Sequence, residues 1–234
     1  MKLLAIDTST ERLSLALCQG EQVWTHEGVA GAQASRHLLP AILALLAQAQ
    51  LPLSSLQAIA FGQGPGAFTG LRTACSVAQG LALGAGLPVL PISTLMCVAA
   101  SAQPTHARVL AVLDARMDQV YAAAFEQVHG QWQACTHPQL SRAEEVTLPP
   151  QWQGQGFTLA TNTGQTLASD WPQLLSQGGE VQAVWPQAKA MLTLAAQAWS
   201  RGEAVAAENA LPVYVRDEVA RTTAQRLADK QAGA

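Results

Sequence analysis

The sequence repeats one short pattern at a distance of 107 residues, and this repeat constrains the fold more than any other feature. In each copy a run of apolar residues ends in an aspartate, Asp7 in the first and Asp114 in the second. A short polar turn and a strand with alternating apolar residues then follow. The copies align without a gap, and a second hairpin follows each one, through Gln19-Gly20 and through His129-Gly130. A duplicated unit of three strands predicts two similar lobes.

Helical and strand patterns alternate after the first copy. Apolar residues recur every three or four positions over 36–49, and Ser35 is a suitable N-cap for a helix there. Pro40 lies inside this helix and would kink its first turns, because proline removes one backbone hydrogen bond. The elements expected next are a strand over 56–61, a helix over 70–85, a strand over 88–92 and a helix capped by Ser93.

This order of three strands followed by alternating helices and strands resembles the ribonuclease H-like lobes of the actin/hexokinase (ASKHA) superfamily. The resemblance implies an α/β fold with two such lobes. Residues 141–185 carry Pro and Gln and only short strand candidates, so the second lobe is expected to be degenerate. We expect lobe one over 1–105, a shortened lobe two over 106–211, and an extended C-terminal segment and tail over 212–234.

A glycine-rich loop joins the strand over 56–61 to the next helix. Its four glycines in nine residues would allow positive φ angles and a close approach to another surface. A GxxxxGK[ST] phosphate loop is excluded because no lysine lies between Lys2 and Lys189, and GxGxxG does not fit because the third glycine comes one residue early. A tight turn that packs a helix closely is the open alternative. The loop residues of interest are Gly64, Pro65, Gly66, Phe68, Thr69, Gly70 and Arg72.

Four motifs together resemble the bacterial TsaB (YeaZ) family. They are LLAIDTST at 3–10, GPGAFTGLR at 64–72, DARMDQVYAAAF at 114–125 and PVYVRDEVA at 212–220, so the resemblance spans nearly the whole chain. The resemblance implies a non-catalytic partner of the TsaD enzyme, which transfers threonylcarbamoyl to the tRNA adenosine next to the anticodon. It also implies TsaE as a further ATPase partner, and a contact with tRNA only through the complex.

The composition is apolar for a chain of 234 residues, with 49% apolar and 12% charged residues. A monomer would have difficulty covering such a surface, so a permanent apolar interface is expected. The net charge is −3 and the 13 basic residues are scattered, which argues against a dedicated nucleic-acid surface. We find no signal peptide, no stretch as long as a membrane span and no CxxC spacing, so we expect a cytoplasmic protein with buried, reduced thiols.

Hydroxyl side chains follow the first aspartate, at the place where superfamily relatives hold nucleotide phosphates and a metal. A nucleotide contact would use Asp7, Thr8, Ser9 and Thr10. The alternative is that these side chains only satisfy the turn that they form. We expect no intrinsic cofactor, and ATP or ADP only at the joint with a partner.

Catalytic machinery is missing from the sequence. A kinase of this superfamily needs a second phosphate loop, but Ala-Arg-Met follows Asp114 in place of hydroxyls. A nuclease needs clustered acids, and only Glu11 lies near Asp7 in the sequence. The related TsaD enzymes bind a metal through a His-x-x-x-His pair, and no two histidines here are four residues apart. We expect no metal and no catalytic residue. An ATP-dependent small-molecule kinase using Asp7 and Asp114 is the alternative function.

Two stripes of small residues run along the expected helix over 70–85, and packing on its own sheet needs only one of them. In the family that the chain resembles, the helices at 36–49 and 70–85 contact TsaD. The same surface would form a homodimer when the chain is alone. The alternative is that both stripes are internal. The expected interface residues are His37, Leu38, Ile42, Thr73, Val77, Ala78, Gly80, Leu81 and Gly84.

The end of the chain is predicted in two parts. Residues 212–216 are expected to form an extended segment that returns to the body of the protein, with Tyr214 buried against a lobe. Beyond Arg221 the sequence has no apolar stripe, so disorder is expected there.

Overall fold

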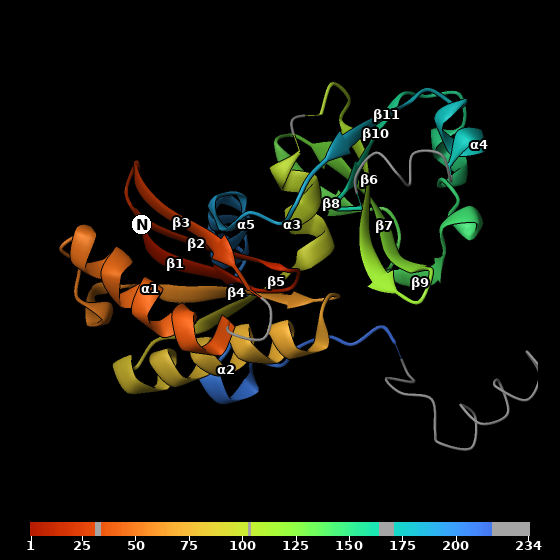
Figure 1. Cartoon of the computed structure of the whole chain (residues 1–234). Coiled ribbons are helices and arrows are strands. Elements are labelled where there is room, and N and C mark those ends of the chain that lie inside the picture. The colour runs from red at the N-terminus through yellow and green to blue at the C-terminus, as the bar shows by residue number, and fades with distance from the viewer. Residues whose placement is uncertain (31–33, 103, 164–170, 217–234) are drawn as a thin grey trace, which may run out of the picture.

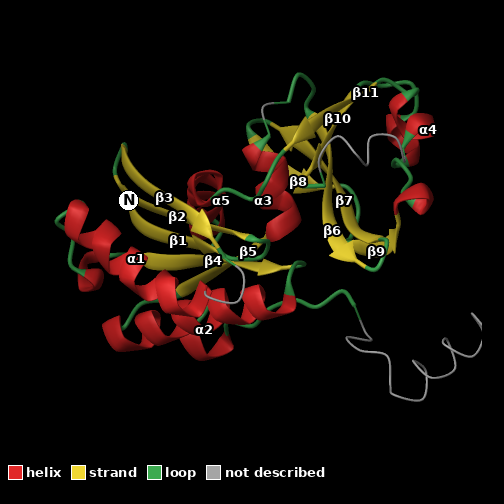
Figure 2. Cartoon of the chain, viewed as in Figure 1, coloured by secondary structure: helices red, strands yellow, loops and turns green. Residues whose placement is uncertain are grey.

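The structure is a computed structural model, and it describes residues 1–30, 34–102, 104–163 and 171–216. Two β-sheets with helices packed on them form this part of the chain (Figure 1 and Figure 2). The mixed α/β class predicted from the sequence is therefore confirmed.

The first sheet has five strands in the order β3-β2-β1-β4-β5. These strands are β1 (Lys2–Asp7), β2 (Arg12–Gln19), β3 (Gln22–Val29), β4 (Ala58–Gly64) and β5 (Val89–Ser93). β1, β2 and β3 pair antiparallel, while β4 runs parallel to β1 and β5 parallel to β4. Because parallel strands need long crossover connections, helices lie between β3 and β4 and between β4 and β5.

Helices cover both faces of this sheet. α1 (Ala34–Gln48) and α2 (Phe68–Ala85) pack on one face, against Leu4 and Ile6 of β1. α5 (Ala188–Ser200) packs on the opposite face, against the β1 side chains that alternate with these. Successive side chains of a strand point to opposite faces, so this central strand is buried on both sides.

The second sheet has the order β11-β10-β6-β7-β8, with β9 also paired to β7. Its strands are β6 (Arg108–Arg116), β7 (Gln119–Val128), β8 (Gln131–Ala134), β9 (Gln139–Arg142), β10 (Phe157–Thr161) and β11 (Gly179–Ala183). α3 (Thr94–Ser101) packs on one face. The buried rings of Trp152 and Trp171, together with the short α4 (Pro172–Leu175), cover the other.

The repeat in the sequence corresponds to a repeat of topology. β6, β7 and β8 are arranged like β1, β2 and β3, and a parallel strand lies beside the first strand of each unit, β4 beside β1 and β10 beside β6. Asp7 and Asp114 stand at matching ends of the two hairpins, where Asp7 pairs with Ser14 and Asp114 with Val120. The later helices differ, because α4 has four residues where the first sheet has the eighteen-residue α2.

The packing does not follow the expected boundaries at 105 and 211. α5 lies within the range expected for lobe two, 106–211, yet it packs on the first sheet. Ala207 and Ala210 also belong to the core of the first sheet, beneath α2. α5 covers the sheet face that α1 and α2 leave open, which a layered domain requires. A division into two lobes stays a prediction, and the end of the chain would have to be counted with the first lobe.

The ends of the predicted helices shift by one or two residues. α1 begins at Ala34, so Ser35 lies inside the helix and is not its N-cap. α2 begins at Phe68, two residues before its expected start. The Ser93 cap of α3 is confirmed, since its Oγ accepts a hydrogen bond from the Met96 amide at 3.3 Å.

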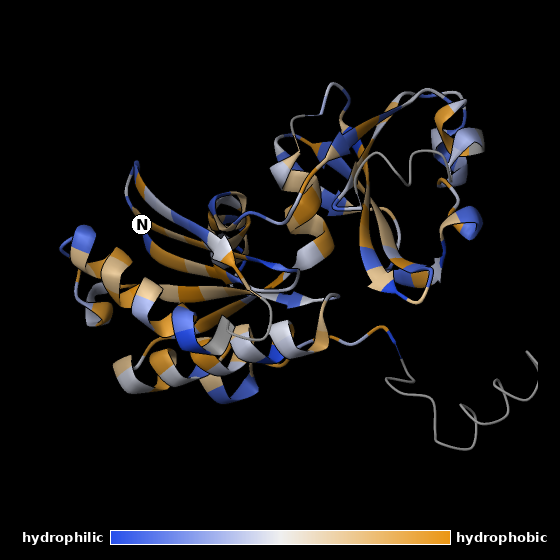
Figure 3. Cartoon of the chain, viewed as in Figure 1, coloured by the Kyte–Doolittle hydropathy of each residue, from blue (hydrophilic) through white to orange (hydrophobic). Residues whose placement is uncertain are grey.

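The most apolar residues lie on the strands of both sheets and on the sides of helices that face them (Figure 3). Of the helices that the structure describes, none has the length and apolar character to cross a membrane.

Candidate functional site

The glycine loop between β4 and α2 packs directly on the turn that follows β1. The Asp7 carboxylate fills the space in which a side chain on Gly62 would begin, and the Thr8 carbonyl oxygen fills the corresponding space at Gly70. Any larger residue at either glycine would collide with this turn. The close approach expected from the glycines is therefore made to a neighbouring turn of the same chain.

The hydroxyl groups of this turn are engaged inside the protein. Thr8 Oγ1 donates to the Gly70 carbonyl at 2.7 Å. Ser9 donates to Asp7 Oδ1 from its amide at 3.0 Å and from its hydroxyl at 2.7 Å. Thr10 Oγ1 accepts from the amide two residues further on at 3.2 Å. The contacts of Ser9 and Thr10 match the alternative in which the residues satisfy their own turn, while Thr8 joins the turn to the start of α2. The hydroxyl protons of Thr8 and Ser9 are both occupied.

Asp7 is a buried acid with one unsatisfied oxygen. Its exposed fraction is 1%, and Oδ2 has no hydrogen-bond partner in the described part of the chain. Burial raises the pKa of Asp7 from 3.8 to about 6, partly offset by the hydrogen bonds from Ser9, and the nearby Glu27 adds a smaller rise. Asp7 therefore exchanges its proton in mildly acidic solution.

The second aspartate lies in a different environment, at the tip of the β6–β7 hairpin. Asp114 Oδ1 accepts from the Arg116 amide at 2.8 Å, and Oδ2 forms an ion pair with the Arg116 guanidinium at 3.3 Å. The Asp114 amide donates to Asn162 Oδ1 at 3.0 Å. Because the side chain of Asp114 is 37% exposed and ion-paired, it is not a second copy of the buried Asp7.

Three consecutive residues of this hairpin have a left-handed backbone. Their φ angles are 64° at Arg116, 55° at Met117 and 56° at Asp118. None of them is glycine, so each conformation costs about 1 kcal/mol. These residues belong to the DARMD motif, and strained backbone of this kind concentrates at binding and catalytic sites.

The C-terminal segment lies across the start of α2. The Tyr214 ring is 5.2 Å from the Phe68 ring, and Arg72 Nε donates to the Tyr214 hydroxyl at 2.9 Å. The extended return of 212–216 is confirmed, but Tyr214 is 41% exposed, so its predicted burial was wrong. The ring covers the edge of the loop and does not enter a core. The expectation for the chain beyond Arg221 lies outside the described residues.

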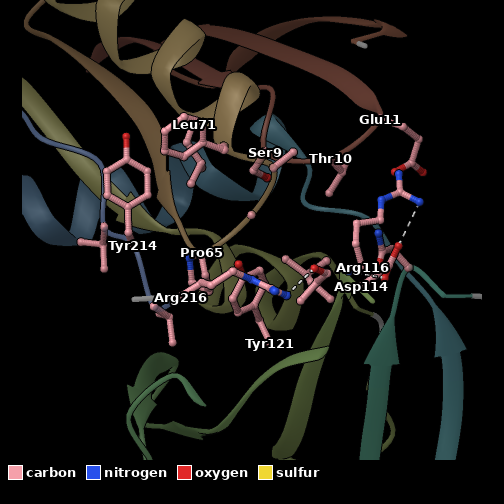
Figure 4. A pocket seen from close by; sticks show the side chains of 18 of the residues that line it. Ser9, Thr10, Glu11, Pro65, Leu71, Asp114, Arg116, Tyr121, Tyr214 and Arg216 are labelled. Atoms are coloured by element: carbon pink, nitrogen blue, oxygen red, sulfur yellow. Dashed lines mark hydrogen bonds and ion pairs between the residues drawn. The ribbon is translucent and has the colours of Figure 1, made fainter. Parts of the chain in front are cut away.

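A cavity of about 240 Å³ with mostly apolar walls lies where these segments meet. Figure 4 shows Tyr121, Tyr214 and Arg216 around one part of it, and Asp114 and Arg116 together at another part. The glycine loop, the hairpin tip and the C-terminal segment all contribute to the lining. Ser9 and Thr10 also line it, so all four motifs, which are far apart in the sequence, converge on one cavity.

The residues predicted to form an interface divide into two sets. Leu38, Ile42 and Ala78 have no exposed surface and belong to the core between the helices and the first sheet. Their side chains have no surface to offer a partner, and this part of the predicted interface is corrected. The exposed or half-buried members are His37, Thr73, Val77, Gly80, Leu81 and Gly84.

Three exposed leucines on the same two helices were not predicted. Leu39, Leu43 and Leu83 expose 42%, 54% and 62% of their surface. Leu39 and Leu43 are four residues apart and lie outside the core stripe of α1. This spacing is visible in the sequence and places the two leucines next to each other on the helix surface. α1 and α2 lie side by side (Figure 1). We define the α1–α2 face as Leu39, Leu43, Val77, Gly80, Leu83 and Gly84.

The thiols and histidines do not form a metal centre in the described ranges. No group of three or more His, Cys, Asp or Glu residues among them could hold an ion. Cys18, Cys75 and Cys97 are buried free thiols, as predicted, and Cys135 is half-buried. Burial raises the pKa of the Cys97 thiol far above its ordinary value, which makes this group unreactive.

Comparison with known proteins gives consistent relatives. A family model described as "TsaD: tRNA N6-adenosine threonylcarbamoyltransferase" matches residues 25–224. The chain is 36% identical over 232 residues to the tRNA threonylcarbamoyladenosine biosynthesis protein TsaB of Escherichia coli K12, covering 94% of this chain and 96% of that protein. It is also 36% identical over 230 residues to TsaB of Haemophilus influenzae, covering 94% of this chain and 95% of that protein.

A solved structure agrees with these matches. YeaZ from Pseudomonas aeruginosa superimposes with a TM-score of 0.83 at 40% sequence identity, covering 91% of this chain and 99% of that one. The agreement of sequence and structure over almost the full length of each relative shows that the chain belongs to the TsaB (YeaZ) family.

Proposed function

We propose that this chain is a non-catalytic subunit that binds and stabilises the TsaD enzyme in the formation of threonylcarbamoyladenosine on tRNA. The names of the relatives in Escherichia coli and Haemophilus influenzae support the pathway, since both are called tRNA threonylcarbamoyladenosine biosynthesis proteins. The role within the pathway is argued from the geometry of this chain.

The state of the two aspartates supports a role without chemistry. The hydroxyl protons beside Asp7 are used within the turn, and Asp114 is held by Arg116. A kinase that used this pair would need free donors for phosphate at both positions, so the kinase alternative is not favoured.

The observation that carries the proposal is the α1–α2 face. It exposes Leu39 and Leu43 on α1 and Leu83 on α2. α2 also carries Gly80 and Gly84, where no atom lies within 4 Å of the position of a side chain. Small residues let a second helix approach closely, and the leucines would gain about 25 cal/mol for each Å² of apolar surface removed from water. We place the contact with TsaD here, and a homodimer on the same face when TsaD is absent.

The remaining partners follow from this placement. tRNA would join through the complex, since the 13 basic residues are scattered along this chain. TsaE would join as a further protein partner. ATP or ADP would bind at the joint between subunits, because the hydroxyl protons of Thr8 and Ser9 are already donated to the Gly70 carbonyl and to Asp7 within the chain.

Leu83→Arg tests the proposed contact, with Leu211→Arg as a matched control. The two leucines are similarly exposed, at 62% and 66%, but only Leu83 belongs to the α1–α2 face. We expect Leu83→Arg to keep its melting temperature and to weaken the binding of purified TsaD at least about tenfold in titration calorimetry. Leu211→Arg should bind like the unmodified chain. A folded Leu83→Arg that binds TsaD normally would place the contact elsewhere.

A further inference from the structure

We propose that the cavity between the glycine loop and the β6–β7 hairpin binds a small organic carboxylate with an apolar body. Its lining shares no residue with the α1–α2 face, so the proposal does not depend on the contact with TsaD. Four features of the lining support it: size, charge, an unpaired hydroxyl and the start of a helix.

The size and the walls define the body of the ligand. The cavity has a volume of about 240 Å³, below the 300–1,000 Å³ typical of sites for drug-sized molecules. Pro65, Leu71 and Met117 are among its apolar walls, and the aromatic ring of Tyr121 adds a flat surface. A compact aliphatic or aromatic group fits these walls, whereas a nucleoside triphosphate is too large and too polar.

The charge of the lining favours an anion near Arg216. Its guanidinium donates to the Ala115 carbonyl at 2.9 Å and lies 3.5 Å from the Met117 sulfur. No carboxylate among the described residues forms an ion pair with it. Asp114, in contrast, is neutralised by its own arginine. Arginine binds carboxylates in a planar, bidentate geometry. An organic acid would therefore supply the negative counter-charge that the Arg216 guanidinium does not find among the described residues.

The other acid in the lining has its own contact. Glu11 accepts a hydrogen bond from Trp185 Nε1 at 2.5 Å, and it is exposed at the rim of the cavity, on the side of Asp114 and away from Tyr121 (Figure 4). The acidic groups and Arg216 therefore occupy different parts of the cavity, which leaves the positive charge available to a ligand.

A hydroxyl without a partner lies in the same wall. Tyr121 is 7% exposed and makes no side-chain hydrogen bond with the residues that the structure describes. Its ring belongs to the core between α3 and the second sheet, so the position of the hydroxyl is set by packing. Tyr121 lines the cavity, and a carboxylate oxygen of a bound ligand would accept the proton of its hydroxyl.

The start of α2 adds further donors. Phe68, its first residue, lines the cavity, and no side chain caps the first amides of this helix. Uncapped amides and the helix dipole both favour negative charge. Together with Arg216 and Tyr121, they form a polar corner in an otherwise apolar cavity.

The test compares a carboxylate with its neutral analogue on the full-length chain. 3-Phenylpropionate and 3-phenylpropanamide have the same body and differ in charge. We expect titration by NMR to show millimolar or tighter binding of the carboxylate, at least about tenfold stronger than that of the amide. Arg216→Gln should abolish this preference. Tyr121→Phe keeps the ring and should weaken the binding of the carboxylate several-fold.

A control and a second pair of probes complete the design. Arg201→Gln removes an exposed arginine that is paired with Glu203 outside the cavity, and it should bind like the unmodified chain. N-acetyl-Ala-Phe and its C-terminal amide separate the two sources of a carboxylate. Binding of the small acid alone indicates a metabolite, and stronger binding of the peptide acid indicates the C-terminus of a polypeptide.

Two results would overturn the proposal. One is equal binding of acid and amide, and the other is the absence of shifts at the cavity residues with all four probes at millimolar concentration. If Arg216→Gln fails to fold, Tyr121→Phe decides, because it removes one oxygen and leaves the packing of the ring.

Discussion

The carboxylate of Asp7 is buried, and the hydrogen bonds from Ser9 offset only part of the cost of ionising it there. Its pKa of about 6 exceeds the ordinary value of 3.8. Between these two pH values the folded chain binds more protons than the unfolded chain, so the free energy of unfolding falls as the pH rises through this window and levels off above it. A difference of roughly two units corresponds to about 3 kcal/mol.

Asp7→Asn removes this titration. The variant should lack the fall of about 3 kcal/mol in unfolding free energy between about pH 4 and pH 6.5. The difference in unfolding free energy between the variant and the unmodified chain should therefore shift in favour of the variant as the pH rises from acidic to neutral. Urea denaturation at several pH values measures this, with Asp114→Asn as the control because that acid is ion-paired and partly exposed. An unchanged pH profile would mean that Asp7 does not titrate in this range.

Two glycines of α2 should respond to alanine in opposite ways. At Gly70 the Thr8 carbonyl occupies the space that the new methyl group needs, so Gly70→Ala should destabilise the chain by more than about 2 kcal/mol. At Gly80 the space is open, so Gly80→Ala should stabilise the helix by about 0.5–1 kcal/mol. Thermal unfolding of both variants checks this, and equal effects would disprove the close approach at Gly70.

Among the elements, the C-terminal segment contacts β5, α2, the glycine loop and the β6–β7 hairpin one after another. Val205 pairs with Val89 of β5, and Gln79 of α2 donates to the carbonyls of Ala207 and Ala210. Further along, the Val213 amide donates to the Gln63 carbonyl, and Arg216 reaches the β6–β7 hairpin. This segment links the glycine loop of the first sheet to the hairpin of the second.

Truncation separates the part of this segment that stabilises the fold from the rest. A chain that ends at Ala220 keeps every contact described above and should keep its melting temperature. A chain that ends at Ala210 loses the bonds of Val213, Tyr214 and Arg216. Its unfolding free energy should fall by about 2–3 kcal/mol and its melting temperature by roughly 4–12 °C for a chain of this length. Calorimetry distinguishes the two, and a collapse of the longer chain would contradict the prediction.

At the scale of the whole molecule, the composition and the exposed leucines of the α1–α2 face lead to the same expectation. Only 12% of the residues are charged, and the face exposes three leucines together with two glycines that have open space above them. A two-fold dimer would cover such a face in the absence of another partner.

Self-association and TsaD binding should therefore compete. In sedimentation velocity the isolated chain should form a dimer that dissociates as TsaD is added, and Leu83→Arg should be monomeric. Leu211→Arg serves again as the control. A ternary species that contains both the dimer contact and TsaD would show that the two surfaces are separate.

Much of the fold follows from patterns that are local in the sequence. The apolar run of β1, the helical spacing of α1 and the Ser93 cap depend on residues within a few positions of one another, and all three are present in the structure. The repeat at 107 residues also predicted that the two sheets share a strand order. Such short-range preferences can be predicted from the sequence because they depend on residues that are close together in the chain.

Tertiary packing alone decided which of the neighbouring stripes is buried. Val77 and Ala78 are both small and apolar, and only the direction from which the first sheet approaches α2 made Ala78 core and left Val77 half-exposed. The same holds for α5, which packs on the first sheet, and for the cavity, which is lined by residues as far apart in the sequence as Ser9 and Arg216. Contacts between distant segments depend on how whole layers pack, and no local pattern encodes that choice.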